Sequence, residues 1–490
     1  MNSSADDPTF PLEPSGQEFL ASLDLIGRRL AAFLDGRDSA PASIGRERLE
    51  ASEHAEALRL LYDSRWPDRP TSLDRLIEVL FDVAIPPGFD AAAPGYLAFV
   101  PGGGLPDTAL ADLIADIVNR YVGIRRASPG LARIDETVLA WFRSLVGYGE
   151  GSGGYLAPGG SIANLTAIVN ARHHRLGDRI SLGTLYVSDQ THHSIAKAAI
   201  HAGLCPEHVR SIPSDSAGRM IEAALLDAIA SDRAAGRIPF LLVSNAGTTN
   251  TGAFDDLTAA AEVARRERLD WHVDAAYGGF FLLTDRGRVR MAGIERADSI
   301  TIDPHKSLFL PYGTGCLLVR DVQRLKRAFD LRGSYMPAES NDDGIDACDL
   351  SPEQTRAFRG LRIWLPLKRH GVEAFRRQLD EKLDLAVDAH ERLTSTAAQE
   401  GLPLELHGPP QLTVVPFRLA PTDRDGIEAD RLTERLGAFV NSAGPIVVSP
   451  TRIAGRAWLR MCILSFRTHR STIDRAVELI LDGARRWSSL

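Results

Sequence analysis

The sequence predicts an α/β protein with a mostly parallel central sheet, an N-terminal helical segment and a small C-terminal α+β domain. From about residue 105, helical and strand-like runs alternate, which is typical of a parallel sheet wrapped by helices. Two apolar runs, 271–274 and 299–302, end in small and polar residues, as strands do where they reach the carboxyl edge of such a sheet. Ligands of open α/β sheets bind at that edge, so we expect the chemistry of the chain there.

The first 104 residues are expected to form a helical segment outside the sheet. Residues 15–36 alternate apolar and polar residues at helical spacing and end at a glycine, which predicts an amphipathic helix in need of a partner surface. After a polar, proline-bearing linker, residues 71–84 are helix-like, and a Gly- and Pro-rich passage leads to the main body. We therefore assign residues 1–104 to an N-terminal helical segment.

The remaining chain divides into a large domain, 105–373, and a small α+β domain, 374–490. The small domain is expected to begin with a long charged helix that runs from 374 to about 400. Residues 471–485 have the pattern of a closing helix. Three segments between them resemble strands, namely LTVVPFRL, PIVVSP and WLRMCILSFR.

Composition indicates an ordinary globular protein. The 490 residues are 44% hydrophobic and 24% charged, and the net charge is −8, a balance typical of such proteins. No dense Lys/Arg run suggests a nucleic-acid or membrane-surface partner, and no apolar stretch approaches the roughly 18 residues of a membrane span. The acidic N-terminus has no apolar signal core, and the 4 cysteines show no CxxC pair or disulfide pattern. A cytoplasmic location is therefore expected.

Asp274 and Lys306 are the leading catalytic candidates. Asp274 ends the first apolar run, and the second run leads into Asp303-Pro304-His305-Lys306. A lysine amine that forms a Schiff base and a carboxylate that keeps a pyridine nitrogen protonated are what pyridoxal 5′-phosphate (PLP) requires. A structural ion pair between the two side chains is the alternative.

The distribution of lysines favours the catalytic interpretation. The only lysines are Lys197, Lys306, Lys326, Lys368 and Lys382, in a chain that otherwise uses arginine. Charged, helix-like surroundings predict a solvated surface role for the last three. A lysine that must lose its proton to attack a carbonyl cannot be replaced by arginine, and Lys306 is the best candidate for that role.

A glycine turn before a predicted helix offers a seat for phosphate. The strand ending near Ala157 breaks at Pro158-Gly159-Gly160, and a helix begins near Ser161. Free N–H groups and the dipole of a helix start bind anions, and the Ser161 hydroxyl adds a donor. Most turns of this composition only connect elements, so the motif alone is weak.

Two more predicted strands end in polar residues. The first leads into His192 and His193. Adjacent histidines do not easily converge on one metal ion and no third ligand is suitably spaced, so no metal site is predicted. A flat imidazole there would stack on a flat cofactor instead. The second, 239–255, ends in small hydroxyl residues that would either hydrogen-bond a cofactor or form a turn.

Together these segments resemble the group II PLP-dependent amino-acid decarboxylases, the family of the aromatic-L-amino-acid and glutamate decarboxylases. The resemblance covers nearly the whole chain. It is carried, in the family's order and near its spacing, by ASPGLARIDETVLAWF (127–142), APGGSIANL, SDQTHHSIAKA, AGTTNTGAFD, HVDAAYGG and DPHK. It is specific for the family and says little about the substrate.

The resemblance implies a type I PLP-dependent (aspartate aminotransferase-like) fold and a set of cofactor contacts. Lys306 would form the Schiff base, Asp274 would pair with the pyridine nitrogen, and His192 would stack on the ring. Ala276 would line the other face of the ring and Thr249 would lie near it. The phosphate would be held by Gly160, Ser161 and His305.

The resemblance also implies a homodimer with shared active sites. The N-terminal helices would wrap over the partner, and a mobile loop would carry Tyr335 into the neighbouring site. Loss of carbon dioxide from an L-amino acid would then be followed by return of a proton to Cα, by Tyr335 directly or through His192. Two alternatives stay open, namely oxidative decarboxylation-deamination to an aldehyde and an inactive scaffold or binding protein on this fold.

The substrate is expected to be an aromatic or a polar or acidic amino acid. The candidate substrate residues are Phe99, Tyr121 and Arg125. Arg125 and Arg126 stand where aromatic-specific relatives have bulky apolar residues nearby. An arginine that faces the pocket would favour an acidic or polar side chain, whereas ion pairs at the dimer interface are the alternative for both arginines.

Overall fold

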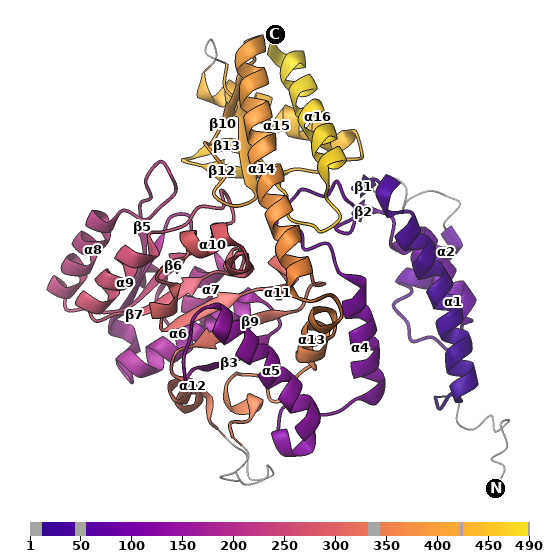
Figure 1. Ribbon diagram of the computed structural model, residues 1–490, viewed down its shortest axis with the longest axis horizontal. Helices are drawn as coiled ribbons and strands as arrows, with labels where there is room; N and C mark the ends of the chain where they lie inside the picture. Colours follow the sequence, from indigo (N-terminus) through magenta and orange to yellow (C-terminus); the bar gives the residue numbers. More distant parts are fainter. Residues whose placement is uncertain (1–11, 45–54, 332–343, 422–424, 489–490) are drawn as a thin grey trace.

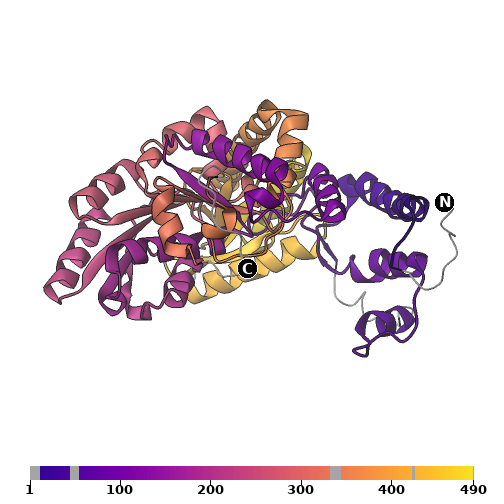
Figure 2. The same cartoon turned by 90° about the horizontal axis from the view of Figure 1, so that it is seen from below.

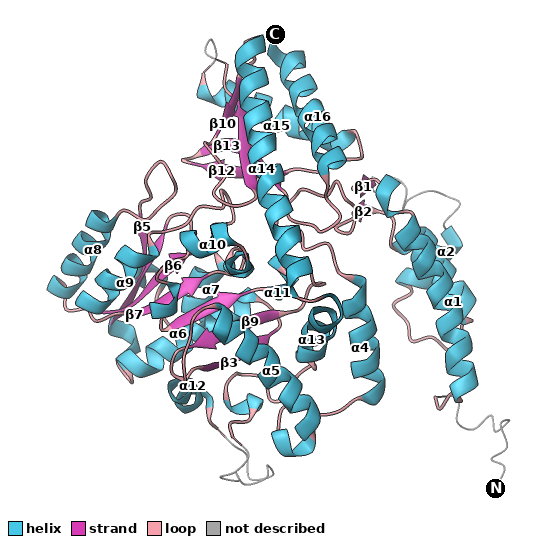
Figure 3. Cartoon of the chain, in the orientation of Figure 1, coloured by secondary structure: helices cyan, strands magenta, loops and turns pink. Residues whose placement is uncertain are grey.

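The computed structural model describes residues 12–44, 55–331, 344–421 and 425–488. The described residues form a central body around a sheet, a C-terminal domain above it in Figure 1, and helices that extend to one side. Figure 3 shows the central sheet enclosed by helices. The α/β prediction is confirmed.

The central sheet has seven strands among the described residues, and only β9 runs against the other six. In spatial order they are β3 (Gly153–Ala157), β9 (Gly315–Val319), β8 (Ser299–Ile302), β7 (Asp270–Asp274), β6 (Ile238–Asn245), β4 (Gly183–Ser188) and β5 (Val209–Ile212). The two apolar runs that predicted the carboxyl edge, β7 and β8, are parallel neighbours. Their ends therefore meet at one place.

Helices cover both faces of this sheet, so its strands, apart from the partly exposed edge strand β5, are largely buried on both sides. On β4, Leu185 and Val187 pack with α6 and α7, whereas Tyr186 between them belongs to the cluster that contains α8 and α9. This alternation is the two-residue period of a strand. The helices of this domain are α4 (Pro106–Val118), α5 (Pro129–Leu145), α6 (Gly160–Leu176), α7 (Ser194–His201), α8 (Glu222–Ala234), α9 (Leu257–Arg266), α10 (Asp285–Arg290), α11 (Pro304–Ser307), α12 (Val322–Phe329) and α13 (Arg359–His370).

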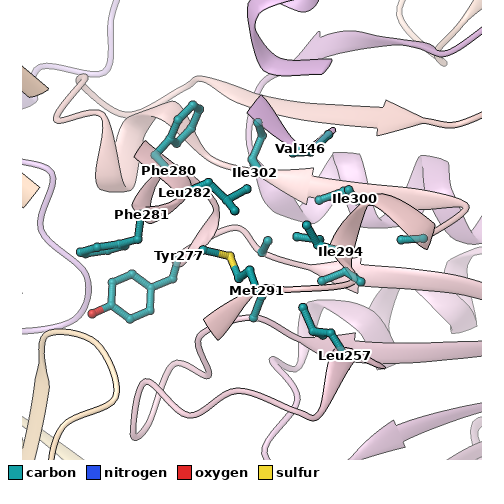
Figure 4. Close-up of a cluster of buried hydrophobic side chains, with 14 of the residues drawn as sticks. Val146, Leu257, Tyr277, Phe280, Phe281, Leu282, Met291, Ile294, Ile300 and Ile302 are labelled. Carbon is teal, nitrogen blue, oxygen red and sulfur yellow. The ribbon is translucent and has the colours of Figure 1, made fainter. Parts of the chain in front are cut away.

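The largest apolar cluster lies against β7 and β8 and makes this part of the edge rigid. Ile302 of β8 lies near Phe280 and Leu282, which follow β7 in the chain, and Ile300 belongs to the same cluster (Figure 4). All four side chains are buried. Because close-packed cores resist displacement, the residues that follow β7 and β8 start from fixed positions.

The C-terminal domain is an antiparallel sheet packed against three helices. Its strand order is β10 (Leu404–Leu406), β11 (Val414–Leu419), β13 (Arg456–Cys462) and β12 (Ser449–Ile453), and its helices are α14 (Val372–Glu400), α15 (Gly426–Ser442) and α16 (Arg470–Ser488). The long helix and the closing helix are confirmed, whereas the strand expected at PIVVSP begins only at Ser449. The first turns of α14 join the core of the large domain and its later turns join that of the small domain. The domain limits at 104 and 373 therefore stay predictions.

The N-terminal arm, which we define as residues 12–44 and 55–89, lies beside the body (Figure 2). It contains α1 (Gly16–Asp35), α2 (Ala55–Tyr62), α3 (Leu73–Glu78) with a following π-helical turn (Val79–Ala84), and the short strands β1 (Ser43–Ile44) and β2 (Gly88–Phe89). Ser15 and Glu18 form a capping box at the start of α1. None of the residues of α1 is buried, so its predicted need for a partner surface is not met within the described chain.

One sequence-based expectation about the lysines is wrong. Lys382 is not a surface residue, because its side chain is fully buried in α14 and its amine donates to Glu381 Oε2 at 2.8 Å and to the Thr468 carbonyl at 2.5 Å. Charged neighbours in sequence predicted exposure, but the C-terminal domain covers this face of the helix. Lys368 is exposed as expected. None of the helices described here has the length and apolar character needed to cross a membrane.

Candidate active site at the carboxyl edge of the sheet

The carboxyl ends of five strands converge on one cavity of about 400 Å³. The strands are β3, β4, β6, β7 and β8, and each supplies the residues that follow it. The cavity is lined by Pro158, Gly159, Gly160, Ser161, Ile162, Asn164, His192, Ser194, Asn245, Gly247, Thr248, Thr249, Asp274, Ala276, Tyr277, Asp303, His305 and Lys306. The structure thus brings together every cofactor-contact residue expected from the sequence.

Asp274 is held at the end of β7 by two donors. Asn164 Nδ2 donates to Oδ2 at 2.9 Å, and the Ala276 N–H donates to Oδ1 at 3.1 Å. The side chain is buried, at 8% exposure. A carboxylate held in this way is oriented before any ligand arrives. Within the described chain, Asp274 and Lys306 form no ion pair. The alternative that these two side chains only make a structural ion pair therefore has no support.

Lys306 lies on the short helix α11 that follows β8. Its Nζ is 3.4 Å from Asp303 Oδ2, and the same oxygen is 3.7 Å from His305 Nε2. His305 Nδ1 donates to the Thr314 carbonyl at 2.6 Å, which turns Nε2 toward Asp303. Asp303 is 1% exposed, and its Oδ1 has no hydrogen-bond partner among the described residues. Lys197, by contrast, is exposed on α7.

The glycine turn after β3 begins α6 directly beside these residues. A Cβ atom at Gly160 would lie 2.8 Å from Asp303 Oδ2 and 3.3 Å from the Ala276 Cβ, so a side chain does not fit there. The N–H groups of Gly160 and Ser161 come before the first hydrogen bonds of this 17-residue helix, which Ile162 and Ala163 donate to the Gly159 carbonyl. Together with the exposed hydroxyl of Ser161, they form an anion seat at the cavity.

His192 lies in the loop between β4 and α7 and lines the cavity. Its Nδ1 is 2.8 Å from Ser194 Oγ and 3.3 Å from the Ser194 backbone nitrogen. Burial lowers the pKa of His192, and Lys306 lowers it further, while Asp274 acts in the opposite direction. His193 is exposed, so only the first of the two histidines faces the cavity.

Arg460 is a residue that the sequence analysis missed. It lies on β13, is 4% exposed, and its Nη1 donates to the carbonyls of Phe99 and Thr249 at 3.0 and 2.9 Å. Burial lowers its pKa. The available signal was an arginine inside the otherwise apolar run WLRMC. This side chain ties the C-terminal domain to the loop after β6.

The candidate substrate residues do not line the cavity in the described chain. Phe99 is 56% exposed, with a strained φ of 54°, and the Tyr121 hydroxyl donates to the Gln354 carbonyl at 2.9 Å. Arg125 pairs with Glu136, and its backbone N–H donates to Asp346 Oδ1 at 2.9 Å. Tyr335 lies outside the described residues. The roles of these four residues stay predictions.

The cavity has the groups that PLP needs. The lysine amine, the buried carboxylate, the imidazole and the helix-start anion seat line one space and match the aldehyde, pyridine nitrogen, ring face and phosphate of that cofactor. Within the described residues, no cluster of three or more His, Cys, Asp or Glu side chains has the arrangement of a metal site. Fold and cavity define a type I PLP-dependent enzyme.

Comparison with known proteins identifies the family. Residues 55–420 match the pyridoxal-dependent decarboxylase conserved domain. The chain is 34% identical over 378 residues to an aromatic-L-amino-acid decarboxylase of Bacillus atrophaeus, covering 76% of this chain and 78% of that protein. It is 36% identical over 293 residues to the cysteine sulfinic acid decarboxylase of Mus musculus, covering 58% and 59%. The chain belongs to the pyridoxal-dependent decarboxylase family.

A solved structure extends the similarity to the complete fold. The crystal structure of Oryza sativa TDC with PLP and tryptamine superposes with a TM-score of 0.89 at 25% identity, and covers 98% of this chain and 99% of that one. The predicted family, fold type and cofactor are therefore confirmed. The chain is an enzyme that uses PLP to decarboxylate an amino acid.

Proposed function

We propose that the cavity at the carboxyl edge is the decarboxylation site and that Lys306, Asp274 and His192 carry its chemistry. The observation that supports this proposal is that all three side chains, from three different elements, line one cavity next to a helix-start anion seat. Lys306 would hold the cofactor covalently through its amine, and Asp274 would accept a hydrogen bond from the pyridine N–H. His192 would cover one face of the ring and Ala276 the other.

The anion seat would hold the cofactor phosphate. Gly160, Ser161 and His305 meet at this end of the cavity, and the absence of a side chain at Gly160 lets a ligand approach the backbone. Thr249 would lie at the edge of the ring. These contacts would fix both ends of the cofactor, because the seat and Asp274 lie on elements joined to the rigid core.

Bound PLP supplies an acceptor for the electron pair of the breaking Cα–carboxylate bond. The residues of the chain would do the rest. Asp274 would keep the pyridine nitrogen protonated, His192 and the walls of the cavity would orient the substrate, and Tyr335, directly or through His192, would return a proton to Cα. The amine of Lys306 would then displace the product.

Two substrate classes stay open in this proposal, the aromatic and the polar or acidic L-amino acids. The relatives named above include enzymes for each class. The test is a screen of the purified protein with PLP over a panel of L-amino acids, measured as carbon dioxide and amine. Equal yields of aldehyde and peroxide would favour the oxidative alternative, and the absence of a cofactor absorbance band would favour the inactive scaffold.

We further propose that the enzyme is a homodimer. On α4, Leu110, Ile114 and Ile117 are 51, 49 and 60% exposed at helical spacing, and α1 has no buried residue. Apolar faces of this kind are covered by a partner in stable proteins, and a second copy is the proposed partner. Light scattering after size exclusion would test this. A cytoplasmic location is proposed because all four cysteines are free.

A further inference from the structure

A continuous hydrogen-bond chain connects Asp274 to His192 through Asn164. Asn164 lies on α6 and is 1% exposed. Its Nδ2 donates to Asp274 Oδ2 at 2.9 Å and to Ser194 Oγ at 3.2 Å, and Ser194 Oγ is 2.8 Å from His192 Nδ1. On its other side, Asn164 Oδ1 is 3.1 Å from His272 Nε2. The carboxamide therefore contacts two side chains of β7 and one at the start of α7.

The donors and acceptors in this chain permit one arrangement around Asn164. A carboxylate only accepts, so the NH₂ group of Asn164 must face Asp274, and its oxygen must face His272. Full burial lowers the pKa of His272 to about 4, so its ring is neutral and donates through Nε2. His272 Nδ1 then accepts from the Ser299 hydroxyl at 2.8 Å.

The same reasoning fixes the proton on His192. The Ser194 backbone N–H donates to His192 Nδ1, so Nδ1 carries no proton in the neutral ring. The Ser194 hydroxyl therefore also donates to Nδ1, and its oxygen is free to accept from Asn164. The ring proton is on Nε2, which is the nitrogen that remains available to a ligand in the cavity.

We propose that Asn164 is a positioning residue of this enzyme: it orients the Asp274 carboxylate and, through Ser194, holds His192 with its proton on Nε2. This inference rests on the roles proposed above for Asp274 and His192. The placement of Asn164 supports it, because Gly160 and Asn164 lie one turn apart on the same face of α6. The start of α6 thus forms the anion seat, and one turn later the same helix supplies Asn164, which donates to the Asp274 carboxylate.

The test compares Asn164 with Asn170, a second buried asparagine of α6. Asn170 is 6% exposed and does not line the cavity. Asn164→Leu and Asn170→Leu make the same change in the same helix, so Asn170→Leu is the control. Asn164→Asp keeps the shape of the side chain and replaces Asn164→Leu if that variant fails to fold. Melting temperature, the PLP dissociation constant and the ¹⁵N shifts of labelled histidines are measured in each, with the His192 signals assigned from their loss in His192→Gln.

We expect Asn164→Leu to raise the PLP dissociation constant about 10-fold or more, which is the usual effect of losing a hydrogen bond to a charged group. The ¹⁵N shifts of His192 should move toward a mixture of both tautomers. Asn170→Leu should lower the melting temperature and change neither quantity. In Asn164→Asp, two carboxyls would face each other, so the affinity for PLP, relative to wild type at each pH, should recover as the pH falls and one of them is protonated.

The inference would be overturned if Asn164→Leu gave the same results as Asn170→Leu. If Asn164→Leu leaves the PLP dissociation constant unchanged, Asn164 does not orient Asp274, and if the His192 shifts are unchanged, it does not hold the tautomer. A pH-independent deficit in Asn164→Asp also contradicts the proposed bond to Asp274. None of these measurements requires turnover. A failure of the proposed function would appear separately, as normal decarboxylation by Lys306→Ala or His192→Gln.

Discussion

At the carboxyl edge of the central sheet, side chains of one chain meet around a cavity, whereas the N-terminal arm and α4 leave apolar side chains exposed. At the sheet edge, Asp274 has two donors and is 8% exposed. On α4, Ile117 is 60% exposed although it belongs to an ordered helix. The first region holds its buried carboxylate with donors from its own chain, and the second still has apolar surface to bury.

This difference separates two parts of the enzyme's function. The proposed cofactor contacts follow strands of one sheet, so one chain positions these residues. Substrate selection and proton return are proposed to involve residues near α4 and the segment that contains Tyr335, where a second chain would complete the site. Substitutions in the first region should act within one subunit, and substitutions in the second should act between subunits.

The largest effect is expected for Lys306→Ala. We expect decarboxylation to fall at least about 10⁴-fold, because neither attachment of the cofactor nor release of the product by the lysine amine remains possible. Lys306→Arg should be equally inactive, since its guanidinium stays protonated. Borohydride reduction of the wild-type enzyme followed by peptide mapping should find the cofactor on Lys306. Recovery of the label on the exposed Lys197 would refute the assignment.

Tyr335→Phe should change the product rather than abolish the reaction. Carbon dioxide would still leave, but slower protonation of Cα would allow oxygen to react, and aldehyde, ammonia and peroxide would replace part of the amine. Amine and peroxide are measured together in one assay, with Tyr312→Phe as the control for a tyrosine outside this segment.

The shared-site hypothesis has its own test. Mixing Lys306→Ala with Tyr335→Phe subunits should restore part of the amine formation, since one of the two sites in a heterodimer would then have both residues. Subunit exchange is verified by differently tagged chains. If amine formation does not recover although the subunits have exchanged, Tyr335 acts only in the active site of its own chain.

Ile117→Glu should weaken subunit association without changing the cofactor site. Loss of one buried isoleucine costs roughly 1.5–3 kcal/mol. A two-fold dimer loses two of them, so we expect the dimer dissociation constant to rise about 10²- to 10⁴-fold. Val289→Glu, at a 78% exposed position on α10, is the matched control. Sedimentation equilibrium measures association, and the cofactor absorbance band reports the site. A variant that remains as tightly associated as the control would remove α4 from the interface.

The sequence predicted the sheet edge better than the rest because its residues follow strands directly. Asp274 and Lys306 each come at the end of a short apolar run, and parallel strands bring such ends together. Asn164 and Arg460 were missed because their partners are distant in sequence, as the 110 residues between Asn164 and Asp274 illustrate. Lys382 was predicted wrongly because it is buried against Thr468, 86 residues away in sequence, and such burial leaves no local pattern.

The smallest effect is expected for Arg125→Leu, which distinguishes a substrate contact from a structural one. Arg125 pairs with Glu136 in the same chain and its side chain is 30% exposed, and ion pairs of this exposure are worth about 0.2–1 kcal/mol. We therefore expect a small loss of stability and equal, modest changes in kcat/KM for polar and aromatic substrates. Arg126→Leu, at an exposed neighbour, is the control.

A selective effect would give the opposite answer for Arg125. If Arg125→Leu lowered kcat/KM for acidic substrates by roughly 1.5–3 kcal/mol while aromatic substrates were unaffected, its guanidinium would bind the substrate in the working enzyme. Glu136→Gln separates the two cases, because it breaks the pair but leaves the arginine charge. A structural pair predicts the same mild loss in both variants. A substrate contact predicts that only Arg125→Leu changes the preference, and the polar site would then extend beyond the sheet edge into the region that a second chain is proposed to complete.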